Sequence, residues 1–488
     1  MSTRILVPSG VLGLGFDQKA LDLGVQCKPD IICIDGGSTD SGPYYLGTGT
    51  SKYSRAVCKS EWRQLMIARA SIDVPLVITS SGTCGSDSMV EWMHDITSEL
   101  ATELGQSLKI ARLYCEQSPQ QIARSMSEGL ACDGDGGDRI RALEPRLSMT
   151  TEDINEDTSD NHTAKTKVAE ATHIVALGGA EQIQLALQEG ADIVIAGRCT
   201  DTASIAALPL LRDEHPGACW HAAKIAECGA LCSNKPTSGV ILVDVDKNGF
   251  SVVPLAEDAA CTPHSVSAHM LYENADPLTL YEPGGYLDVR DARYEACEYP
   301  NLTQAAVRVT GSNWVDDSTY TVKLEGARLV GYQVTQLAVL RDRHYVENAT
   351  LWTDKLKTFL QEQIKERMAI AAADYLLDFR LIGQNSVFGE LEQREVVPVE
   401  VGVLLIITAE SSEVAGEIAK LANPFLLHYP LSEFEELPTF AFPYSPAESH
   451  RGALYEFMLN HVMVLDDPMD AFRLEFSQLG EKIETRVS

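Results

Sequence analysis

The residues best suited to bind an anion lie in a hydroxyl-rich turn of the first half of the chain. Residues 80–87 read Ser-Ser-Gly-Thr-Cys-Gly-Ser-Asp and follow an apolar run at 74–79. Glycine and serine let backbone N–H groups approach a carboxylate or phosphate, and the following helix adds its positive end. We therefore predict that three residues of this turn bind substrate: Ser81, Gly82 and Thr83. Cys84 is a candidate nucleophile if the helix end lowers its pKa. Simple helix capping by Ser86 or Asp87 explains the same pattern.

A second turn, at residues 197–203, places an arginine beside an acid in the segment Gly-Arg-Cys-Thr-Asp-Thr-Ala. A guanidinium held at a strand end can bind a carboxylate or phosphate through two hydrogen bonds. We predict that Arg198 and Thr200 bind substrate, and that Asp201 acts as a base, orients Arg198 or ligates a cation. The alternative is an internal ion pair between Arg198 and Asp201.

Acidic residues also occur in a glycine-rich loop at residues 35–42, Asp-Gly-Gly-Ser-Thr-Asp-Ser-Gly. Such a loop suits a sugar hydroxyl or a metal, although ordinary turns have the same composition. We include Ser38 among the substrate-binding candidates. For the cofactor, we expect either none or a divalent metal. The candidate ligands for such a metal are Asp35, Asp40 and Asp201. The glycine-rich turns match neither the dinucleotide fingerprint nor the P-loop, so NAD and ATP have no support.

Two histidines follow in the segment Thr262–Glu273. His264 and His269 are five residues apart, so they do not share one helix face as residues four apart would. Histidine changes its charge near neutral pH and is a common acid or base. We choose His264 as the catalytic candidate, and a structural role is the alternative for each histidine.

The elements that must position these turns are six apolar runs, most of them followed by a Gly- or Ser-rich turn. They cover residues 4–9, 30–34, 74–79, 110–115, 173–177 and 192–196. Continuous apolar strands that alternate with helices indicate an α/β fold with a mostly parallel sheet and helices on both faces. Right-handed crossovers place the turns at one edge, where ligands of such sheets bind. The site should therefore form around one small anionic substrate.

The later part of the chain changes in pattern. A polar insertion is predicted at 132–167, and alternating strands begin at about residue 240, followed by a helix over 351–377. Residues 396–488 resemble a small α+β domain with a ferredoxin-like layer. Its predicted elements are a strand at 396–408, a helix at 412–421 and a strand at 425–429. We expect two domains, 1–395 and 396–488.

The composition excludes several classes of function. The chain has 39 basic and 70 acidic residues among 488, a formal net charge of −31. Such a surface repels nucleic acid and anionic membranes, although buried cations can still bind an anion. The 12 cysteines form no paired metal motif, which favours free thiols in a reducing compartment. The sequence has no apolar run long enough to cross a bilayer and no signal peptide, so we expect a cytoplasmic protein. We also expect it to be a homo-oligomer.

Four segments carry a resemblance to a known family: residues 197–202, 262–273, 283–285 and 320–327. At these positions the chain resembles the acyclic terpene utilisation AtuA family. The resemblance implies a cytosolic metabolic enzyme, a lyase or hydratase, linked to the breakdown of branched acyl-CoA thioesters or polycarboxylic acids. It adds three residues to Arg198, Asp201 and His264 without fixing their roles: Glu282, Lys323 and Glu325. We include Glu282 and Lys323 among the catalytic candidates.

The leading hypothesis is a lyase or hydro-lyase acting on a small, branched or polycarboxylic acid or its CoA thioester. Arg198 and the amides of residues 81–85 would bind the carboxylate or stabilise an enolate, while His264 or Asp201 would move the proton. A second hypothesis is an amide or thioester hydrolase with Cys84 or Ser81 as nucleophile. A third is a non-catalytic subunit that assembles through the C-terminal domain.

Overall fold

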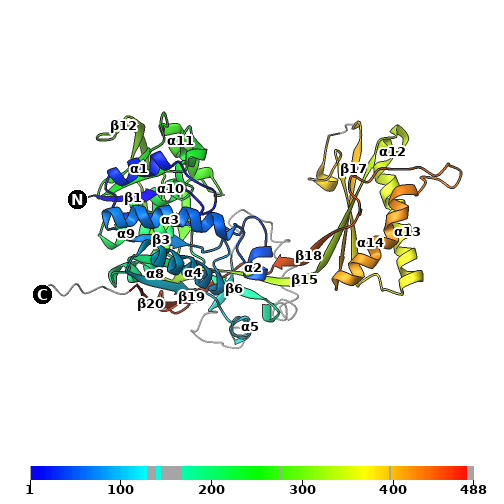
Figure 1. Cartoon of the computed structure of the whole chain (residues 1–488), viewed down its shortest axis with the longest axis horizontal. Coiled ribbons are helices and arrows are strands. Elements are labelled where there is room, and N and C mark those ends of the chain that lie inside the picture. The colour runs from blue at the N-terminus through cyan, green and yellow to red at the C-terminus, as the bar shows by residue number, and fades with distance from the viewer. Residues whose placement is uncertain (1, 129–138, 144–167, 275, 395–396, 481–488) are drawn as a thin grey trace. The chain divides into compact units, whose positions relative to one another are not determined.

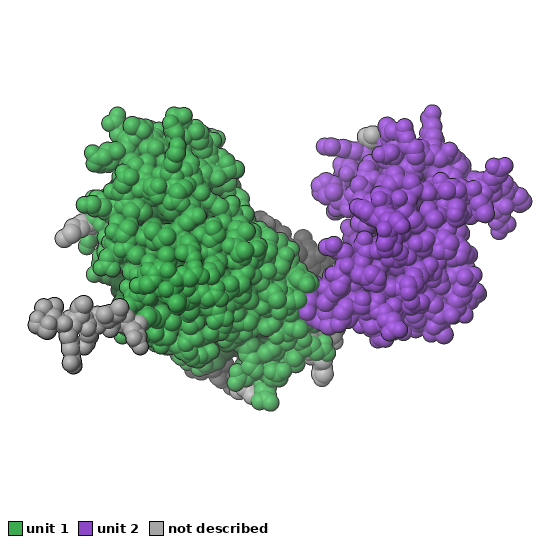
Figure 2. All heavy atoms as spheres, in the orientation of Figure 1, with its two compact units in different colours: residues 1–328, 457–488 green, residues 329–456 purple. Residues whose placement is uncertain are grey.

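The chain forms two compact units in a computed structural model (Figure 2). Unit 1 comprises residues 1–328 and 457–488, and unit 2 comprises residues 329–456. The structure describes residues 2–128, 139–143, 168–274, 276–394 and 397–480. The domain boundary expected at residue 396 differs from this division, because it falls inside unit 2. Most of the predicted insertion at 132–167 lies outside the described residues.

The centre of unit 1 is a sheet of parallel strands (Figure 1). In spatial order these are β1 (Thr3–Val7), β2 (Ile31–Asp35), β3 (Leu76–Thr79), β7 (Ile193–Ala196) and β4 (Leu108–Tyr114). Nearly all of their residues are buried, as strands covered on both faces require. The predicted α/β class is confirmed, and five of the six predicted strands lie in this parallel sheet.

Helices cover both faces of this sheet, as the sequence predicts. One core joins Leu6 and Ile32 to α1 (Gln18–Gln26), α3 (Arg55–Ile72) and α4 (Asp87–Leu104). The opposite core joins Ile5 and Ile31 to the helices on the other face. These are α8 (Ala180–Gln188), α9 (Ala203–Leu211) and α10 (Pro216–Ala226). Successive strand residues point to opposite faces, so alternate apolar positions serve the two cores.

The sheet is nevertheless only partly parallel, which corrects the prediction of a mostly parallel one. Five further strands extend it, all antiparallel to their neighbours. They are β8 (Ile241–Asp246), β9 (Gly249–Pro254), β13 (Ala305–Thr310) and β12 (Arg293–Glu298) beside β1, and β20 (Arg473–Leu479) beside β4. For β8 and β9 the reason is their short connection, because a tight turn joins only antiparallel strands.

The apolar run at 173–177 does form a strand, β6 (His173–Ala176), but outside the parallel sheet. It pairs antiparallel with residues 324–327 of the long strand β15 (Tyr320–Leu340). Strands β19 (His461–Leu465) and β5 (Ile140–Ala142) continue this second sheet in unit 1. An apolar run indicates that a strand is buried but not which strand it pairs with. The sequence therefore assigned β6 to the wrong sheet.

Unit 2 is a separate α+β layer. Residues 332–340 of β15 pair with β17 (Val401–Ala409), which pairs with β16 (Tyr375–Ile382), all antiparallel. Helices α13 (Ala349–Met368) and α14 (Ser412–His428) pack on these strands. The strand predicted at 425–429 is instead the end of α14, which continues through Pro424. The predicted helix over 351–377 ends at Met368, and a ferredoxin-like topology is not confirmed.

No helix among the described residues is long and apolar enough to cross a bilayer.

Candidate functional site

A cavity of about 190 Å³ opens where the chain leaves β1, β2, β3 and β7. This is the carboxyl edge of the parallel strands, where the sequence places the site. Five carboxylates are among its lining residues: Asp35, Asp40, Asp201, Glu227 and Glu273. Among the described residues that line it, Lys52 is the one lysine or arginine. The site is thus a small, acid-rich cavity with one cation at its wall.

Asp35 ends β2 and is buried at the cavity wall. Its Oδ1 accepts hydrogen bonds from the backbone N–H groups of Gly36 (2.7 Å) and Gly37 (3.3 Å). Burial, and next the charge of Asp201, raise the pKa of Asp35 well above its usual range. The Arg198 guanidinium offsets only part of this effect. Asp35 is therefore a carboxyl group that retains its proton to higher pH than an ordinary aspartate.

Arg198 follows β7, and its charge is compensated inside the protein. Its Nε donates to Oε2 of Glu325 (3.1 Å), and its Nη1 donates to Oγ of Ser80 (3.1 Å). Nη1 also lies 3.5 Å from Oδ1 of Asp201. The internal ion pair that the sequence left open is therefore present. Arg198 does not occur among the described residues that line the cavity.

Asp201 is the residue of the 197–203 turn that reaches the cavity. Its side chain is 34% exposed, whereas that of Arg198 is 6% exposed. Asp201 also stands beside other acids, because its charge raises the pKa values of Asp35, Glu227 and Glu282. It is thus an accessible carboxylate held by a buried arginine.

Glu282, at the end of β10 (Thr279–Glu282), contacts the threonines of the 197–203 turn. Thr202 donates its hydroxyl hydrogen bond to Oε1 of Glu282, and Thr200 lies 3.2 Å from Thr202 between hydroxyl oxygens. Oε2 is buried without a hydrogen-bond partner in the described part of the chain. Burial, more than the nearby charge of Asp201, raises the pKa of Glu282 to about 7. The predicted substrate residue Thr200 thus lies beside Glu282, through the hydroxyl of Thr202.

In the 80–87 turn, only Thr83 lines the cavity. Ser81 is buried and donates its hydroxyl to the backbone carbonyl of Ala196 (2.8 Å). Cys84 is also buried, and burial raises the pKa of its thiol, the opposite of the direction expected at a helix end. Gly82 has a φ of +64°, and a Cβ there would meet the Met89 side chain, so glycine serves packing. The turn contributes one hydroxyl rather than an activated nucleophile.

The remaining predicted residues are dispersed. His264 is exposed on α11 (Pro263–Ala268), and Lys323 is also exposed, with Nζ 3.5 Å from Oε1 of Glu325. Ser38 lines the cavity. The structure thus brings Ser38, Thr83 and Asp201 together there, in addition to Asp35 and Asp40. Among the described lining residues, neither Ser81, Arg198 nor His264 occurs, so the expected convergence of these three is not found.

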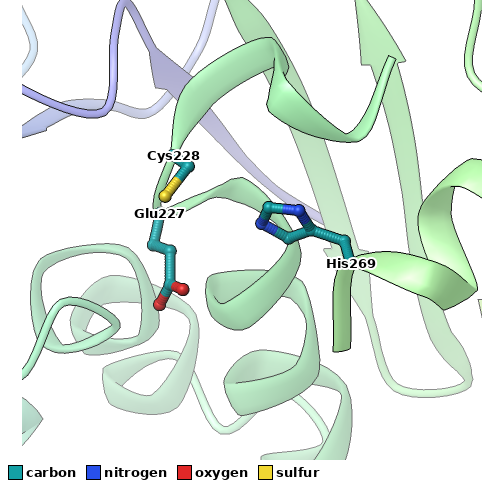
Figure 3. A group of neighbouring side chains, drawn as sticks. All are labelled: Glu227, Cys228 and His269. Carbon is teal, nitrogen blue, oxygen red and sulfur yellow. The ribbon is translucent and has the colours of Figure 1, made fainter. Parts of the chain in front are cut away.

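The sequence missed a group formed by Glu227, Cys228 and His269 (Figure 3). The sequence around Cys228 gives a weak indication of a metal site, because Cys232 follows four residues later. A single pair of this spacing does not predict a metal. His269 differs from His264 in being buried, and burial lowers its pKa to about 4. The spacing of the two histidines could not distinguish them, because burial depends on where the short helix packs.

Comparison with known proteins gives one result. A family model described as "Acyclic terpene utilisation family protein AtuA" matches residues 65–432. No curated protein and no solved structure matches the chain. The matched range contains Asp201, Glu227, Cys228 and His269, and it begins after Asp35.

Proposed function

Because the chain belongs to the acyclic terpene utilisation AtuA family, we propose that it is an enzyme of carboxylic acid breakdown. Its proposed reaction is the reversible addition of water to a small, branched carboxylic acid or its CoA thioester. The substrate class rests on the family and on Lys52, the one lysine or arginine among the described residues that line the cavity. The reaction type rests on the carboxyl groups.

The supporting observation is that Asp35 and Asp201 both line the cavity and that the charge of Asp201 acts on Asp35. Addition and elimination of water need one group that gives a proton and one that takes it. Two carboxyl groups perform both tasks when their surroundings differ. Asp35 is buried and its pKa is raised, whereas Asp201 is accessible and ion-paired with Arg198.

In the dehydration direction, Asp201 removes a proton from the carbon next to the carboxyl or thioester carbonyl. The electron pair of that C–H bond forms the double bond, and the C–O bond to the neighbouring hydroxyl breaks. Asp35 donates its proton to the departing oxygen, which leaves as water. Hydration is the reverse. Arg198 is a positioning residue, because it acts through Asp201 and does not line the cavity.

Substrate binding falls to other residues that line the cavity. Lys52 can pair with a carboxylate, and Ser38 carries a hydroxyl donor. The Thr83 hydroxyl donates to the backbone carbonyl of Gly36 (3.2 Å), so Thr83 shapes this part of the cavity. Negative charge that develops on the carbonyl oxygen during proton removal is stabilised by Lys52 and Ser38. The excess of acids disfavours substrates with several anionic groups inside the cavity, so the CoA portion of a thioester would remain outside.

The test is a screen of purified full-length chain against branched 3-hydroxy acids, the matching unsaturated acids and their CoA thioesters. Loss or gain of the conjugated double bond is followed by absorbance. Turnover of one such pair in both directions supports the proposal. Hydrolysis of the thioester without hydration would contradict it and favour a hydrolase, for which buried Ser81 and Cys84 offer no accessible nucleophile.

A further inference from the structure

Three side chains of unlike chemistry meet at the end of α10. A carboxylate oxygen of Glu227, Sγ of Cys228 and a ring nitrogen of His269 all lie within 4.8 Å of one another. Glu227 and Cys228 directly follow α10, and His269 begins the short helix η4 (His269–Leu271). Figure 3 shows the imidazole directed toward the other two side chains. Oxygen, sulfur and nitrogen are the three ligand types that zinc takes in proteins.

His269 supplies an independent indication of a ligand. It is 5% exposed, and its Nε2 is buried with no hydrogen-bond partner in the described residues. Its ring stacks on Tyr272, with 5.3 Å between centroids and 8° between planes. A buried polar atom without a partner is uncommon and needs an explanation. A neutral imidazole with a fixed ring and a free nitrogen is what a metal ion binds.

The surroundings favour a positive ion. Glu227 and Cys228 lie at the C-terminus of α10, where the helix dipole is negative. The neighbouring acid Asp201 adds negative charge, and it raises the pKa values of Glu227 and Cys228. Lys224 contacts one oxygen of Glu227 and donates to the backbone carbonyl of Tyr272 (2.8 Å). That lysine explains the burial of Glu227 but leaves Nε2 of His269 unpartnered.

The backbone at Cys228 is held by glycines. A Cβ on Gly10 would lie 2.8 Å from Cα of Cys228. Gly229 has a φ of +60°, and a Cβ there would lie 2.3 Å from the carbonyl oxygen of Gly239. Neither position accepts another residue without displacement of the chain. The thiol is therefore presented from a fixed point of the cavity wall.

We propose that Glu227, Cys228 and His269 bind a divalent transition metal ion of the zinc type at the wall of the cavity. Three protein ligands with a fourth position open to a cavity is the composition of catalytic rather than structural zinc sites. Glu227 and Cys228 line the cavity, so that position faces it. The inference does not rest on the proposed hydration reaction.

Binding requires small, balanced changes. Zinc–ligand distances of about 2.0–2.3 Å place ligand atoms roughly 3.3–3.8 Å apart, so the three side chains must close by about 1 Å. The Cys228 thiol gives up its proton to solvent when the metal binds. Lys224 keeps its contact with one Glu227 oxygen while the other becomes the ligand.

The test is the metal content of purified full-length protein, stripped with a chelator and dialysed against Zn²⁺ or Co²⁺. We expect about one ion per chain and a cysteinate-to-cobalt charge-transfer absorption. Cys228→Ser should abolish that absorption. Loss of a residue that only supports a metal ligand weakens metal binding by about 10- to 100-fold, so loss of the ligand itself in His269→Gln should weaken zinc binding by more than that. The matched controls are His264→Gln, at an exposed position of α11, and Cys297→Ser, on β12. Both should bind zinc and cobalt as the wild type does.

Two outcomes would overturn the inference: wild-type protein that retains no zinc or cobalt, or cobalt spectra in which Cys228→Ser matches the wild type. Thermal melting of each variant separates loss of ligands from loss of fold. The wild-type cobalt spectrum needs no variant, so misfolding cannot mask the answer. Metal content is measured without substrate, so a bound ion in a protein that hydrates nothing would refute only the proposed reaction.

Discussion

Arg198 and Glu325 are 127 residues apart in the chain and form a buried ion pair, with Nε 3.1 Å from Oε2 and side chains only 6% and 8% exposed. The pair joins the turn after β7 to β15. It also explains why an arginine at a ligand-binding edge is not a substrate ligand: its hydrogen-bonding capacity is used by Glu325, Ser80 and Asp201. The charge that reaches the cavity from this turn is that of Asp201.

We predict that Glu325→Gln destabilises the protein. The change leaves the buried guanidinium with a neutral partner, and breaking a buried ion pair costs about 3–5 kcal/mol. Because Asp201 still pairs with Arg198, the loss should lie at the low end of that range. Urea denaturation measures it, with exposed Glu257→Gln as the control, for which a change within about 0.5 kcal/mol is expected. Equal stability of the two variants would show that the pair contributes nothing.

The raised pKa of Glu282 predicts a pH-dependent stability. Its pKa rises from 4.5 to about 7 on folding, so between these values the folded chain binds a proton that the unfolded chain lacks. Stability from this group is complete below pH 4.5 and is lost as pH rises to about 7, by about 3 kcal/mol at most. The free energy of unfolding of the wild type, measured by urea denaturation at several pH values, should fall relative to Glu282→Gln. A constant difference across this window would refute the shift.

Replacement of either proposed acid–base group should reduce turnover. Asp201→Asn and Asp35→Asn keep the size of the side chain but remove the transferable proton, so kcat should fall by about 100- to 10,000-fold. The measurement is hydration of the substrate found in the screen, with circular dichroism melts to verify folding. Asp213→Asn, exposed in the turn after α9, is the control. If Asp201→Asn turned over substrate at the wild-type rate, the assigned base would be wrong.

The thiol of Cys84 should resist alkylation in the folded protein. Burial both blocks access and raises its pKa, and only the thiolate reacts. Mass spectrometry after brief iodoacetamide treatment at neutral pH should find Cys84 unmodified, while Cys27 and Cys297, both partly exposed, react first. Rapid and selective labelling of Cys84 would instead revive the hydrolase hypothesis.

Much of the fold and part of the site could be predicted from sequence, for physical reasons. Apolar runs ending in Asp35 and before Asp201 predict strand ends, and the rule that parallel strands place their turns at one edge predicts their meeting. Residue type does not report exposure, however. Arg198 and His264 look equally suited to bind substrate, yet one is buried against acids and the other faces solvent. Glu227 has no local pattern that marks a site, because His269, which completes its group, comes from a distant part of the chain.

Asp201 influences the protons of Asp35, Glu227 and Glu282 at once. The negative charge of Asp201 therefore makes ionisation of each of these three acids harder. A pH–rate profile of this protein will therefore report interacting groups and not isolated side chains. Neutralising Asp201 will release its neighbours, and their pKa values will all move downward together.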